Sequence, residues 1–417
     1  MKSFKVLVAG GGSGGCSVAA KFASLLPKGS VGIIESAEIL FQTHYYQPMW
    51  TLVGGGMKSV KDSAKPMSEV LPKKAVWIKD SVASFKPKEN TVSLSSGENV
   101  QYEYLVVALG IKLEYNRIKG LPEAFETPGV GSNYSTEYVD KTFQSLKDFK
   151  EGNAIFTFPN TPVKCAGAPQ KIMYIADEYM RKHGVRDKAN IYFNTSLGAL
   201  FGVKKYADAL WKIVEERKIS VNLMHELVEV KPDTREAVFR LLNKPEETKT
   251  YKYSMLHITP PMGPPDAVKN STDLCAESGY VDVDKYTLQH TRFSNIFGIG
   301  DCTNLPTSKT AAAIAAQGNI LYQNMKCVME KKSDSKEKYD GYTSCPLVTG
   351  YSKCVLAEFD YDGNPLETFP INQARESRLA FHMKKDIMPT LYWQLFLRGM
   401  WNGPRLTRKL LHLGMSK

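Results

Sequence analysis

Three glycines near the N-terminus have the spacing of a phosphate-binding turn. Gly10, Gly12 and Gly15 form the pattern Gly-x-Gly-x-x-Gly between an apolar run and a helical pattern. In such a turn the first glycine permits the tight bend, the second lets a pyrophosphate approach the backbone, and the third lets the helix pack closely on the strand. Glu35 follows about twenty residues later, where a carboxylate accepts hydrogen bonds from a ribose. The motif predicts a dinucleotide site with contacts from Gly10, Gly12, Ser13, Gly14, Gly15 and Glu35.

A cysteine stands where a second phosphate-binding turn would be expected. The apolar run 154–158 is followed by residues 159–169, which read Pro-Asn-Thr-Pro-Val-Lys-Cys-Ala-Gly-Ala-Pro. Pro159, Pro162 and Cys165 occupy the turn, so a pyrophosphate would lack its backbone N–H donors there. The pattern argues against a nicotinamide as the reductant. It favours a thiol or sulfide as the electron source, with a thiolate as the nucleophile.

The glycine turn and Cys165 both lie within alternating strand and helix patterns. This alternation predicts parallel sheets covered by helices. The expected strands cover 5–9, 31–34, 104–109, 154–158, 190–194 and 219–224, and the expected helices cover 16–26, 170–182 and 204–217. We therefore predict an α/β fold with two Rossmann-like dinucleotide-binding-type domains and a C-terminal amphipathic helical membrane-binding region.

The second domain is predicted to be inserted into the first. Residues 255–261 close the second domain as residues 104–110 close the first half, and the chain then returns to the first domain through residues 279–301. The predicted boundaries give a first domain of residues 1–120 and 276–335, a second Rossmann-like domain of residues 121–275, and a C-terminal region of residues 336–417.

Composition excludes several classes of protein. The hydrophobic share of 43% and the charged share of 23% are ordinary globular values, and no apolar run is long enough to cross a bilayer as a helix. Seven cysteines are too few for a disulfide scaffold and indicate a reducing compartment. The net charge of +11 comes from scattered cations, so no nucleic-acid partner is expected, and no Cys/His spacing predicts a metal site. Because the N-terminus enters a strand at once, we expect a presequence to be absent from this chain or already removed.

The segment from Arg378 onward mixes aromatic and aliphatic residues with cations. Residues 391–401 read Leu-Tyr-Trp-Gln-Leu-Phe-Leu-Arg-Gly-Met-Trp, and more Arg and Lys follow. Such segments can lie flat in the headgroup region of an anionic membrane. They can also pack on a sheet as terminal helices. We predict membrane contact, with terminal packing as the alternative.

A strand near residue 300 resembles a flavoprotein motif. Residues 295–301 read Asn-Ile-Phe-Gly-Ile-Gly-Asp and precede a small-residue helix expected at 310–316. The two features together are similar to the second FAD motif of flavoproteins with two dinucleotide-binding domains. The resemblance implies FAD as the cofactor, with contacts from Asp301, Ala311, Ala312 and Ala313.

Three further segments resemble one family in particular. Residues 45–54 (Tyr-Tyr-Gln-Pro-Met-Trp-Thr-Leu-Val-Gly), 163–171 (Val-Lys-Cys-Ala-Gly-Ala-Pro-Gln-Lys) and 343–348 (Thr-Ser-Cys-Pro-Leu-Val) are similar to sulfide:quinone oxidoreductase of the animal mitochondrial type. The similarity extends over nearly the whole chain. It implies the flavin-dependent disulfide reductase fold, and it adds Gln47 and Val82 as FAD-contacting positions.

The resemblance also implies a reaction. Cys165 and Cys345 would flank the flavin and hold a sulfur-bridged oxidised state, which hydrogen sulfide attacks. A persulfide would form on Cys345, and the Cys165 thiolate would attack the flavin. Glutathione or sulfite would take the outer sulfur, and ubiquinone would take the electrons at the mitochondrial inner membrane, where the protein would be peripheral or monotopic. Lys164 and Lys171 either favour the Cys165 anion or are ordinary surface charges.

Other interpretations remain open at this point. One is a quinone reductase driven by NADH, which the missing second glycine motif opposes, and another is a flavin-binding membrane scaffold without turnover. Among the remaining cysteines, Cys16 is predicted to be a packed small residue, and Cys302 is assigned to the cofactor region rather than to redox chemistry. Cys354 is the main rival of Cys345 but lacks the family's sequence context.

Overall fold

A seven-stranded sheet carries the glycine turn. The computed structural model describes residues 2–36, 43–332 and 337–412. The sheet has the order β5-β2-β1-β8-β7-β6, in which β7 pairs with the first residues of β8 and β19 pairs with its last. The strands are β1 (Lys2–Ala9), β2 (Val31–Ile34), β5 (Val76–Ile78), β6 (Val82–Lys86), β7 (Thr91–Leu94), β8 (Asn99–Val107) and β19 (Ile296–Gly298). The core strands β5, β2, β1, β8 and β19 are parallel, as the alternating pattern predicted.

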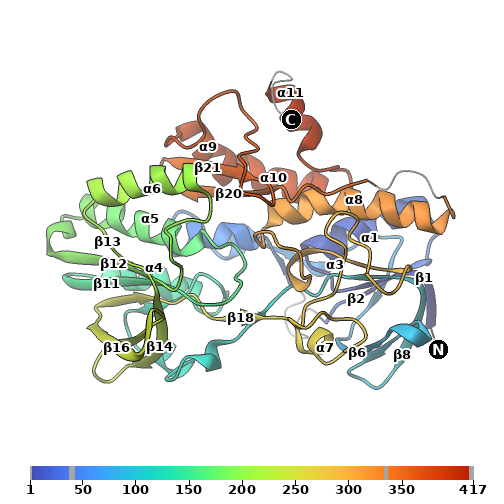
Figure 1. Cartoon of the computed structure of the whole chain (residues 1–417), viewed down its shortest axis with the longest axis horizontal. Coiled ribbons are helices and arrows are strands. Elements are labelled where there is room, and N and C mark those ends of the chain that lie inside the picture. Colours follow the sequence, from blue (N-terminus) through green and yellow to red (C-terminus); the bar gives the residue numbers. More distant parts are fainter. Residues whose placement is uncertain (1, 37–42, 333–336, 413–417) are drawn as a thin grey trace.

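Two long helices cover one face of this sheet. Helix α1 (Ser13–Leu25) begins directly after Gly12, and helix α8 (Ala311–Met329) packs against it (Figure 1). Small residues such as Cys16 and Ala19 are fully buried on α1, which allows the close approach. Helix α8 begins at the predicted place, after Thr310, but it is 19 residues long and runs well beyond the expected end at residue 316.

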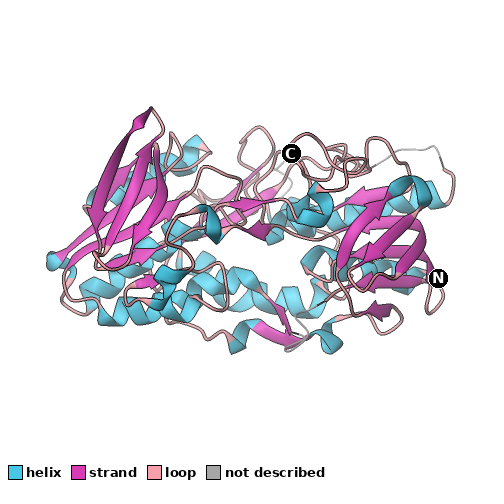
Figure 2. Ribbon diagram, turned by 90° about the horizontal axis from the view of Figure 1, so that it is seen from below, coloured by secondary structure: helices cyan, strands magenta, loops and turns pink. Residues whose placement is uncertain are grey.

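The second sheet is a separate parallel sheet in the order β10-β17-β11-β12-β13. Helix α5 packs on one face, and a three-stranded antiparallel sheet contacts β11 and β12. The seven-stranded sheet and this part of the molecule lie at opposite ends of the long axis (Figure 2). The elements are β10 (Val130–Gly131), α4 (Val139–Asp148), β11 (Gly152–Phe158), α5 (Ala168–Lys182), β12 (Ala189–Thr195), α6 (Lys204–Glu216), β13 (Ser220–Asn222), β14 (His225–Lys231), β15 (Glu236–Leu241), β16 (Lys244–Lys252) and β17 (Met255–His257).

The C-terminal region lies across both Rossmann-like parts (Figure 1). Strand β20 contacts α5 of the second part and α8 of the first, so it holds the two together. After β21 the chain forms short helical segments, with wide π-helical turns at residues 383–387 and 392–396. These elements are β20 (Thr343–Val348), β21 (Cys354–Phe359), α9 (Arg378–His382), α10 (Met388–Leu391) and α11 (Arg405–Leu411). The predicted boundary between residues 335 and 336 falls outside the described residues.

Short elements connect these layers. They are β3 (Thr43–Tyr45), α2 (Trp50–Gly54), β4 (Ala64–Pro66), α3 (Met67–Val70), β9 (Lys112–Leu113), β18 (Met262–Gly263) and α7 (Asp266–Lys269). Within the described ranges, the helices include none with the length and apolar character needed to cross a membrane.

Candidate active site

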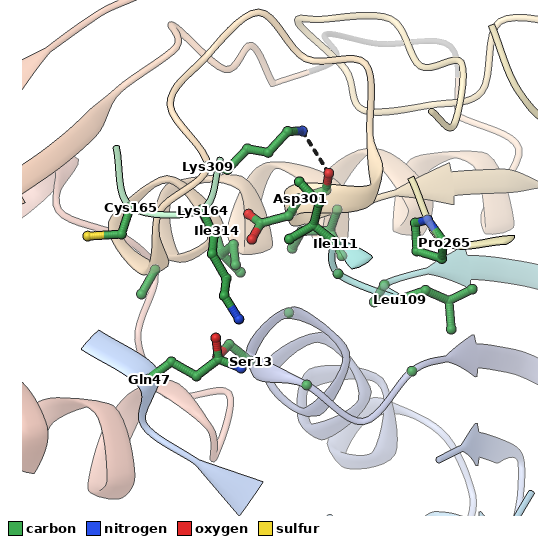
Figure 3. A pocket seen from close by; sticks show the side chains of 18 of the residues that line it. Ser13, Gln47, Leu109, Ile111, Lys164, Cys165, Pro265, Asp301, Lys309 and Ile314 are labelled. Carbon is green, nitrogen blue, oxygen red and sulfur yellow. Dashed lines mark hydrogen bonds between the residues drawn. The ribbon is translucent and has the colours of Figure 1, made fainter. Parts of the chain in front are cut away.

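A cavity of about 550 Å³ extends from the glycine turn to Cys165 (Figure 3). Its wall is built from the carboxyl ends of β1, β2 and β8, the start of α1, and the turn that precedes α5. Ligands of open α/β sheets bind at the carboxyl ends of the strands. The cavity therefore lies where the fold places a dinucleotide.

The geometry of the glycine turn matches the role assigned to each glycine. Gly10 has φ +105°, and a Cβ there would lie 2.4 Å from the Ala108 carbonyl oxygen. A Cβ on Gly15 would lie 1.8 Å from the Gly10 carbonyl oxygen, so the helix can approach the strand only at a glycine. A Cβ on Gly12 would meet nothing within 4 Å, so the backbone there faces open space. Open space at the N-terminus of α1 is what a pyrophosphate requires.

The carboxylates at the two ends of the cavity fit the hydroxyl groups of FAD. Glu35 lines the cavity beside the glycine turn, and its Oε2 accepts a hydrogen bond of 2.6 Å from the Gly11 backbone N–H. Asp301 lines the other half, and its Oδ1 is buried with no hydrogen-bond partner among the described residues. Burial raises the pKa of Asp301, and the nearby Lys309 and Lys164 oppose that rise. A buried acceptor that lacks a donor is suited to a ribityl hydroxyl.

Most of the predicted cofactor contacts lie on the cavity wall. Gly15 instead supports the turn from behind, Ala312 lines a neighbouring apolar space, and Ala313 is 1% exposed and faces the interior. The Ala313 backbone N–H donates to the Thr310 hydroxyl, which caps the helix. The structure thus does not bring the Ala313 side chain to the cavity. The predicted residues on the wall are Gly10, Gly12, Ser13, Gly14, Glu35, Gln47, Val82, Asp301 and Ala311.

Two cysteines from distant parts of the chain meet at the far end of the cavity. Cys165 lies in the turn between β11 and α5, and Cys345 lies on β20. Each thiol shifts the pKa of the other, so the two sulfur atoms lie close together. Gly167 makes this approach possible, because a Cβ on it would lie 2.5 Å from the Cys345 Sγ. Cys165 lines the cavity itself, whereas Cys345 is 4% exposed behind it.

The backbone holds Cys165 in an unusual conformation. Its φ is +53°, in the left-handed region that non-glycine residues rarely adopt. Its N–H donates to the Lys309 carbonyl over 2.7 Å, and its carbonyl accepts from the Ala168 N–H and the Tyr134 hydroxyl. Such conformations persist where the surrounding contacts fix them, and they concentrate at functional sites.

Two buried lysines give this thiol site its charge. Lys171 on α5 is 2% exposed, and its Nζ lies 3.3 Å from the Cys165 Sγ. The neighbouring Cys345 thiol, together with Lys171 and Lys384, holds the pKa of Cys165 well below that of an ordinary thiol, against the effect of burial. The neighbouring Cys165 thiol and burial raise the pKa of Cys345. The arrangement therefore provides a Cys165 thiolate beside a protonated Cys345.

The lysines near Cys165 are not the surface charges that one interpretation allowed. Lys171 is buried, and Lys164 is half-buried, lines the cavity and points into it (Figure 3). Burial lowers the pKa of Lys164 to about 8. Lys384, in the C-terminal region, is 3% exposed, and burial together with Lys171 lowers its pKa to about 8. Sequence reasoning missed Lys384, because its neighbours suggested a cationic surface segment.

The other buried cysteines lack this environment. Burial raises the pKa of Cys16, of Cys302 to about 11 and of Cys354 to about 12. Cys16 donates to the Gly11 carbonyl and is a packed residue, as predicted. Within the described ranges, His, Cys, Asp and Glu side chains form no group of three or more that would hold a metal ion.

Two further spaces adjoin the thiol site. An apolar chamber of about 200 Å³ shares Pro48, Cys165, Thr310 and Ala311 with the large cavity, and it extends toward Tyr392 and Trp401 of the C-terminal region. We call it the apolar chamber. A separate space of about 350 Å³ opens on the other side of the turn, beside Ala166 and Gln170.

Comparison with known proteins agrees with this geometry. Residues 4–153 and 167–318 match the family model described as pyridine nucleotide-disulphide oxidoreductase. Fold and site thus define a two-dinucleotide-domain oxidoreductase of that class. The crystal structure of the sulfide:quinone oxidoreductase from Aquifex aeolicus superposes with a TM-score of 0.81 at 21% identity, over 100% of this chain and 96% of that one, which supports the fold.

The sequence relatives are more specific. The mitochondrial sulfide:quinone oxidoreductase of Mus musculus is 56% identical over 99% of this chain and 90% of that protein. The protein of the same name from Dictyostelium discoideum is 48% identical over 96% of this chain and 87% of that protein. The chain belongs to the family of mitochondrial sulfide:quinone oxidoreductases. It is a flavin oxidoreductase, and its cofactor is FAD.

Proposed function

We propose that the chain oxidises hydrogen sulfide at Cys165 and Cys345 and delivers the two electrons to ubiquinone. The observation that carries the proposal is the close approach of the Cys165 and Cys345 thiols at the end of the dinucleotide cavity, beside the buried Lys171. The name of the mouse relative, which is 56% identical, gives the same donor and acceptor class. The residues before α5 also support a thiol route, because they lack the glycine turn that a nicotinamide nucleotide needs.

The two cysteines have different roles in this proposal. In the oxidised enzyme a disulfide bond joins their Sγ atoms, and hydrosulfide attacks the Cys345 Sγ. One sulfur–sulfur bond forms and one breaks, so Cys345 becomes a persulfide and Cys165 leaves as a thiolate. Lys171, 3.3 Å from the Cys165 Sγ, stabilises that leaving anion. Bound FAD supplies a two-electron acceptor next to Cys165, which lines its cavity.

The space beside Ala166 is the proposed entrance for sulfide and for the sulfur acceptor. It lies on the side of the turn away from the dinucleotide cavity, and polar groups of Gln170, Thr307 and Ser308 line it. A small thiol or oxyanion such as glutathione or sulfite then takes the outer sulfur from the Cys345 persulfide. The sulfur chemistry and the electron exit are thereby kept on different sides of the thiol pair.

The apolar chamber is the proposed quinone site. Aromatic and aliphatic side chains such as Tyr46, Leu391 and Phe396 line it, and Cys165 and Ala311 separate it from the dinucleotide cavity. Buried Glu358 and Lys384 also reach its wall. A quinone has an apolar body with two polar oxygens, so a mostly apolar chamber with a few charged groups suits it.

We also propose that the protein is peripheral or monotopic at the mitochondrial inner membrane. The mouse and Dictyostelium relatives are named as mitochondrial. The C-terminal region exposes large apolar side chains next to cations, as an interfacial segment does. The exposed residues are Leu379 at 58%, Ile387 at 48%, Met400 at 58%, Leu406 at 69% and Leu410 at 68%. A quinone that resides in the lipid would then enter the chamber directly.

Anaerobic stopped-flow measurement of flavin absorbance tests the proposed chemistry. Sulfide should bleach the wild-type flavin, and NADH should not. Cys165→Ser and Cys345→Ser should each slow the bleaching by more than about a thousandfold, because each removes a sulfur that the exchange requires. Cys354→Ser is the matched control, since that thiol is buried like Cys345 but lies outside the pair. Normal turnover in both Cys165→Ser and Cys345→Ser, or bleaching by NADH alone, would refute the proposal.

A further inference from the structure

One hydroxyl in the C-terminal region touches the glycine turn. The Tyr392 hydroxyl lies 2.7 Å from the Ser13 Oγ and 2.6 Å from the His44 Nε2. Tyr392 is 5% exposed and His44 is 4% exposed, so water does not share these contacts. Ser13 lines the dinucleotide cavity, and Tyr392 lines the apolar chamber. The same hydrogen-bonded group therefore borders both sites.

The direction of these hydrogen bonds follows from the state of His44. Burial lowers the pKa of His44 to about 4, so its ring is neutral at physiological pH. The neighbouring Gly11 carbonyl opposes this lowering of the His44 pKa, as an acceptor that faces an imidazole N–H does. A neutral imidazole has one donor and one acceptor nitrogen, so with its N–H toward that carbonyl its Nε2 accepts from Tyr392. The Tyr392 oxygen is then free to accept from the Ser13 hydroxyl, and one chain of hydrogen bonds joins Ser13 of the glycine turn to His44.

Other contacts of the C-terminal region converge on the same part of the first domain. The Tyr392 ring lies 4.5 Å from the Tyr46 ring, centroid to centroid. Lys384 donates to the Pro48 carbonyl over 2.7 Å, and Lys21 on α1 donates to the Asn402 Oδ1 over 2.6 Å. Residues 384–402 therefore dock in part on the segments around the glycine turn, whereas α9 packs on β20 and β21.

We propose that Tyr392 is a positioning residue that links FAD binding at the glycine turn to docking of residues 378–402. It acts through Ser13 and His44. When residues 378–402 are docked, Tyr392 holds the Ser13 hydroxyl and, through His44, the Gly11 carbonyl in the orientation found here. When FAD occupies the turn, that orientation is already fixed, and docking requires less ordering.

The link must work in both directions. A group that favours FAD binding through docking makes FAD favour docking by the same factor. Because residues 378–402 form one wall of the apolar chamber, the chamber is complete only after the cofactor has bound. A quinone would then bind in a complete chamber only when the protein already holds FAD.

Hydrogen–deuterium exchange and FAD titration test this link on the full chain. In the wild type, FAD should slow amide exchange in residues 378–402 by more than tenfold relative to the apo-protein. In Tyr392→Phe the slowing should fall to less than about threefold. The FAD dissociation constant should rise about tenfold, which corresponds to about 1.4 kcal/mol. Trp393→Phe is the control, because the Trp393 ring packs against the rings of His44 and Tyr392, whereas the described hydrogen bonds of the Tyr392 hydroxyl go to Ser13 and His44.

A double-mutant cycle separates the link from a general loss of stability. If Tyr392 acts through Ser13, the effects of Ser13→Ala and Tyr392→Phe on the FAD dissociation constant should not be additive, and the double variant should resemble Tyr392→Phe. Additive effects would overturn the proposal. So would a Tyr392→Phe protein that exchanges faster in residues 378–402 but binds FAD as tightly as the wild type. Both results concern FAD affinity and exchange, so they are independent of whether sulfide is the substrate.

Discussion

Replacement of Lys171 by Met removes the nearest positive charge from the Cys165 sulfur. The Lys171 Nζ is 3.3 Å from that sulfur, and the side chain is 2% exposed on α5. Methionine has a similar length and suits a buried position, so the fold should persist. The variant therefore changes the charge beside the thiol with little change in packing.

The size of the effect follows from this geometry. Two unit charges 3.3 Å apart interact by about 5 kcal/mol at an effective dielectric constant of about 20. Lys384 also lowers the pKa of Cys165 and remains in place, and measured hydrogen bonds to charged groups contribute about 1.5–3 kcal/mol. We therefore expect Lys171→Met to raise the pKa of Cys165. The fraction of thiolate at a fixed pH below that pKa should fall by about 10- to 150-fold.

Alkylation of the reduced enzyme by iodoacetamide measures that fraction, because only the thiolate reacts quickly. The rate at Cys165, followed by mass spectrometry between pH 5 and pH 9, should show its midpoint at higher pH in Lys171→Met. Lys182→Met is the control on the same helix, since Lys182 is exposed and pairs with Glu178. If the pH profiles of Lys171→Met and the wild type coincide, the lysine does not stabilise the thiolate and this reasoning is wrong.

Three further predictions concern other parts of the site. Burial lowers the pKa of Lys384 from 10.5 to about 8, so its charged form opposes folding below pH 8 and the wild type should become more stable as the pH rises from 8 to 10.5. Guanidinium unfolding at pH 7 should show Lys384→Met to be about 1–3 kcal/mol more stable than the wild type, and this difference should shrink between pH 8 and pH 10.5. Gly12→Ala should change the melting temperature of the apo-protein by less than about 2 °C but weaken FAD binding more than tenfold, whereas Gly15→Ala should fail to fold. If Gly12→Ala binds FAD as tightly as the wild type, the pyrophosphate does not lie at this turn. The double variant Leu406→Asp/Leu410→Asp should sediment with anionic vesicles at least tenfold less than the wild type, while sulfide should still bleach its flavin. Unchanged sedimentation would rule out membrane contact through α11.

The sequence was sufficient to predict the features that local backbone geometry determines. The glycine turn was predictable because each position has a steric reason, and the contacts at Gly10 and Gly15 agree with those reasons. Cys165 could be identified from the sequence because it lies where a second Gly-x-Gly-x-x-Gly turn would be expected. The helix after residue 310 was also located correctly at its start, although its length was underestimated.

Features that depend on contacts between distant segments were not predictable in the same way. Lys384 and Tyr392 are separated by hundreds of residues from the groups they contact, Pro48 and Ser13. Their sequence neighbours are aromatic and cationic, which suggested a surface segment, and no local pattern distinguishes a cation that turns inward. Ala313 shows the opposite case, because its place in a small-residue run suggested a flavin contact but the helical rotation directs it to the interior.

The place of Cys165 explains how a nucleotide-binding scaffold accommodates sulfur chemistry. In the first domain, the N-terminus of α1 presents free N–H groups and a positive dipole end to the site of the pyrophosphate. In the second domain, the turn before α5 has the same relation to its sheet, but it holds a thiol three residues before the helix begins at Ala168. A helix N-terminus lowers the pKa of a nearby thiol for the same reason that it attracts phosphate. Lys171 then adds a full charge within the first turns of α5, where a nucleotide site would rely on backbone N–H groups alone. Introducing Gly-x-Gly-x-x-Gly at this turn in place of Cys165 would therefore remove the thiolate and leave the buried Lys171 charge without the sulfur that it contacts.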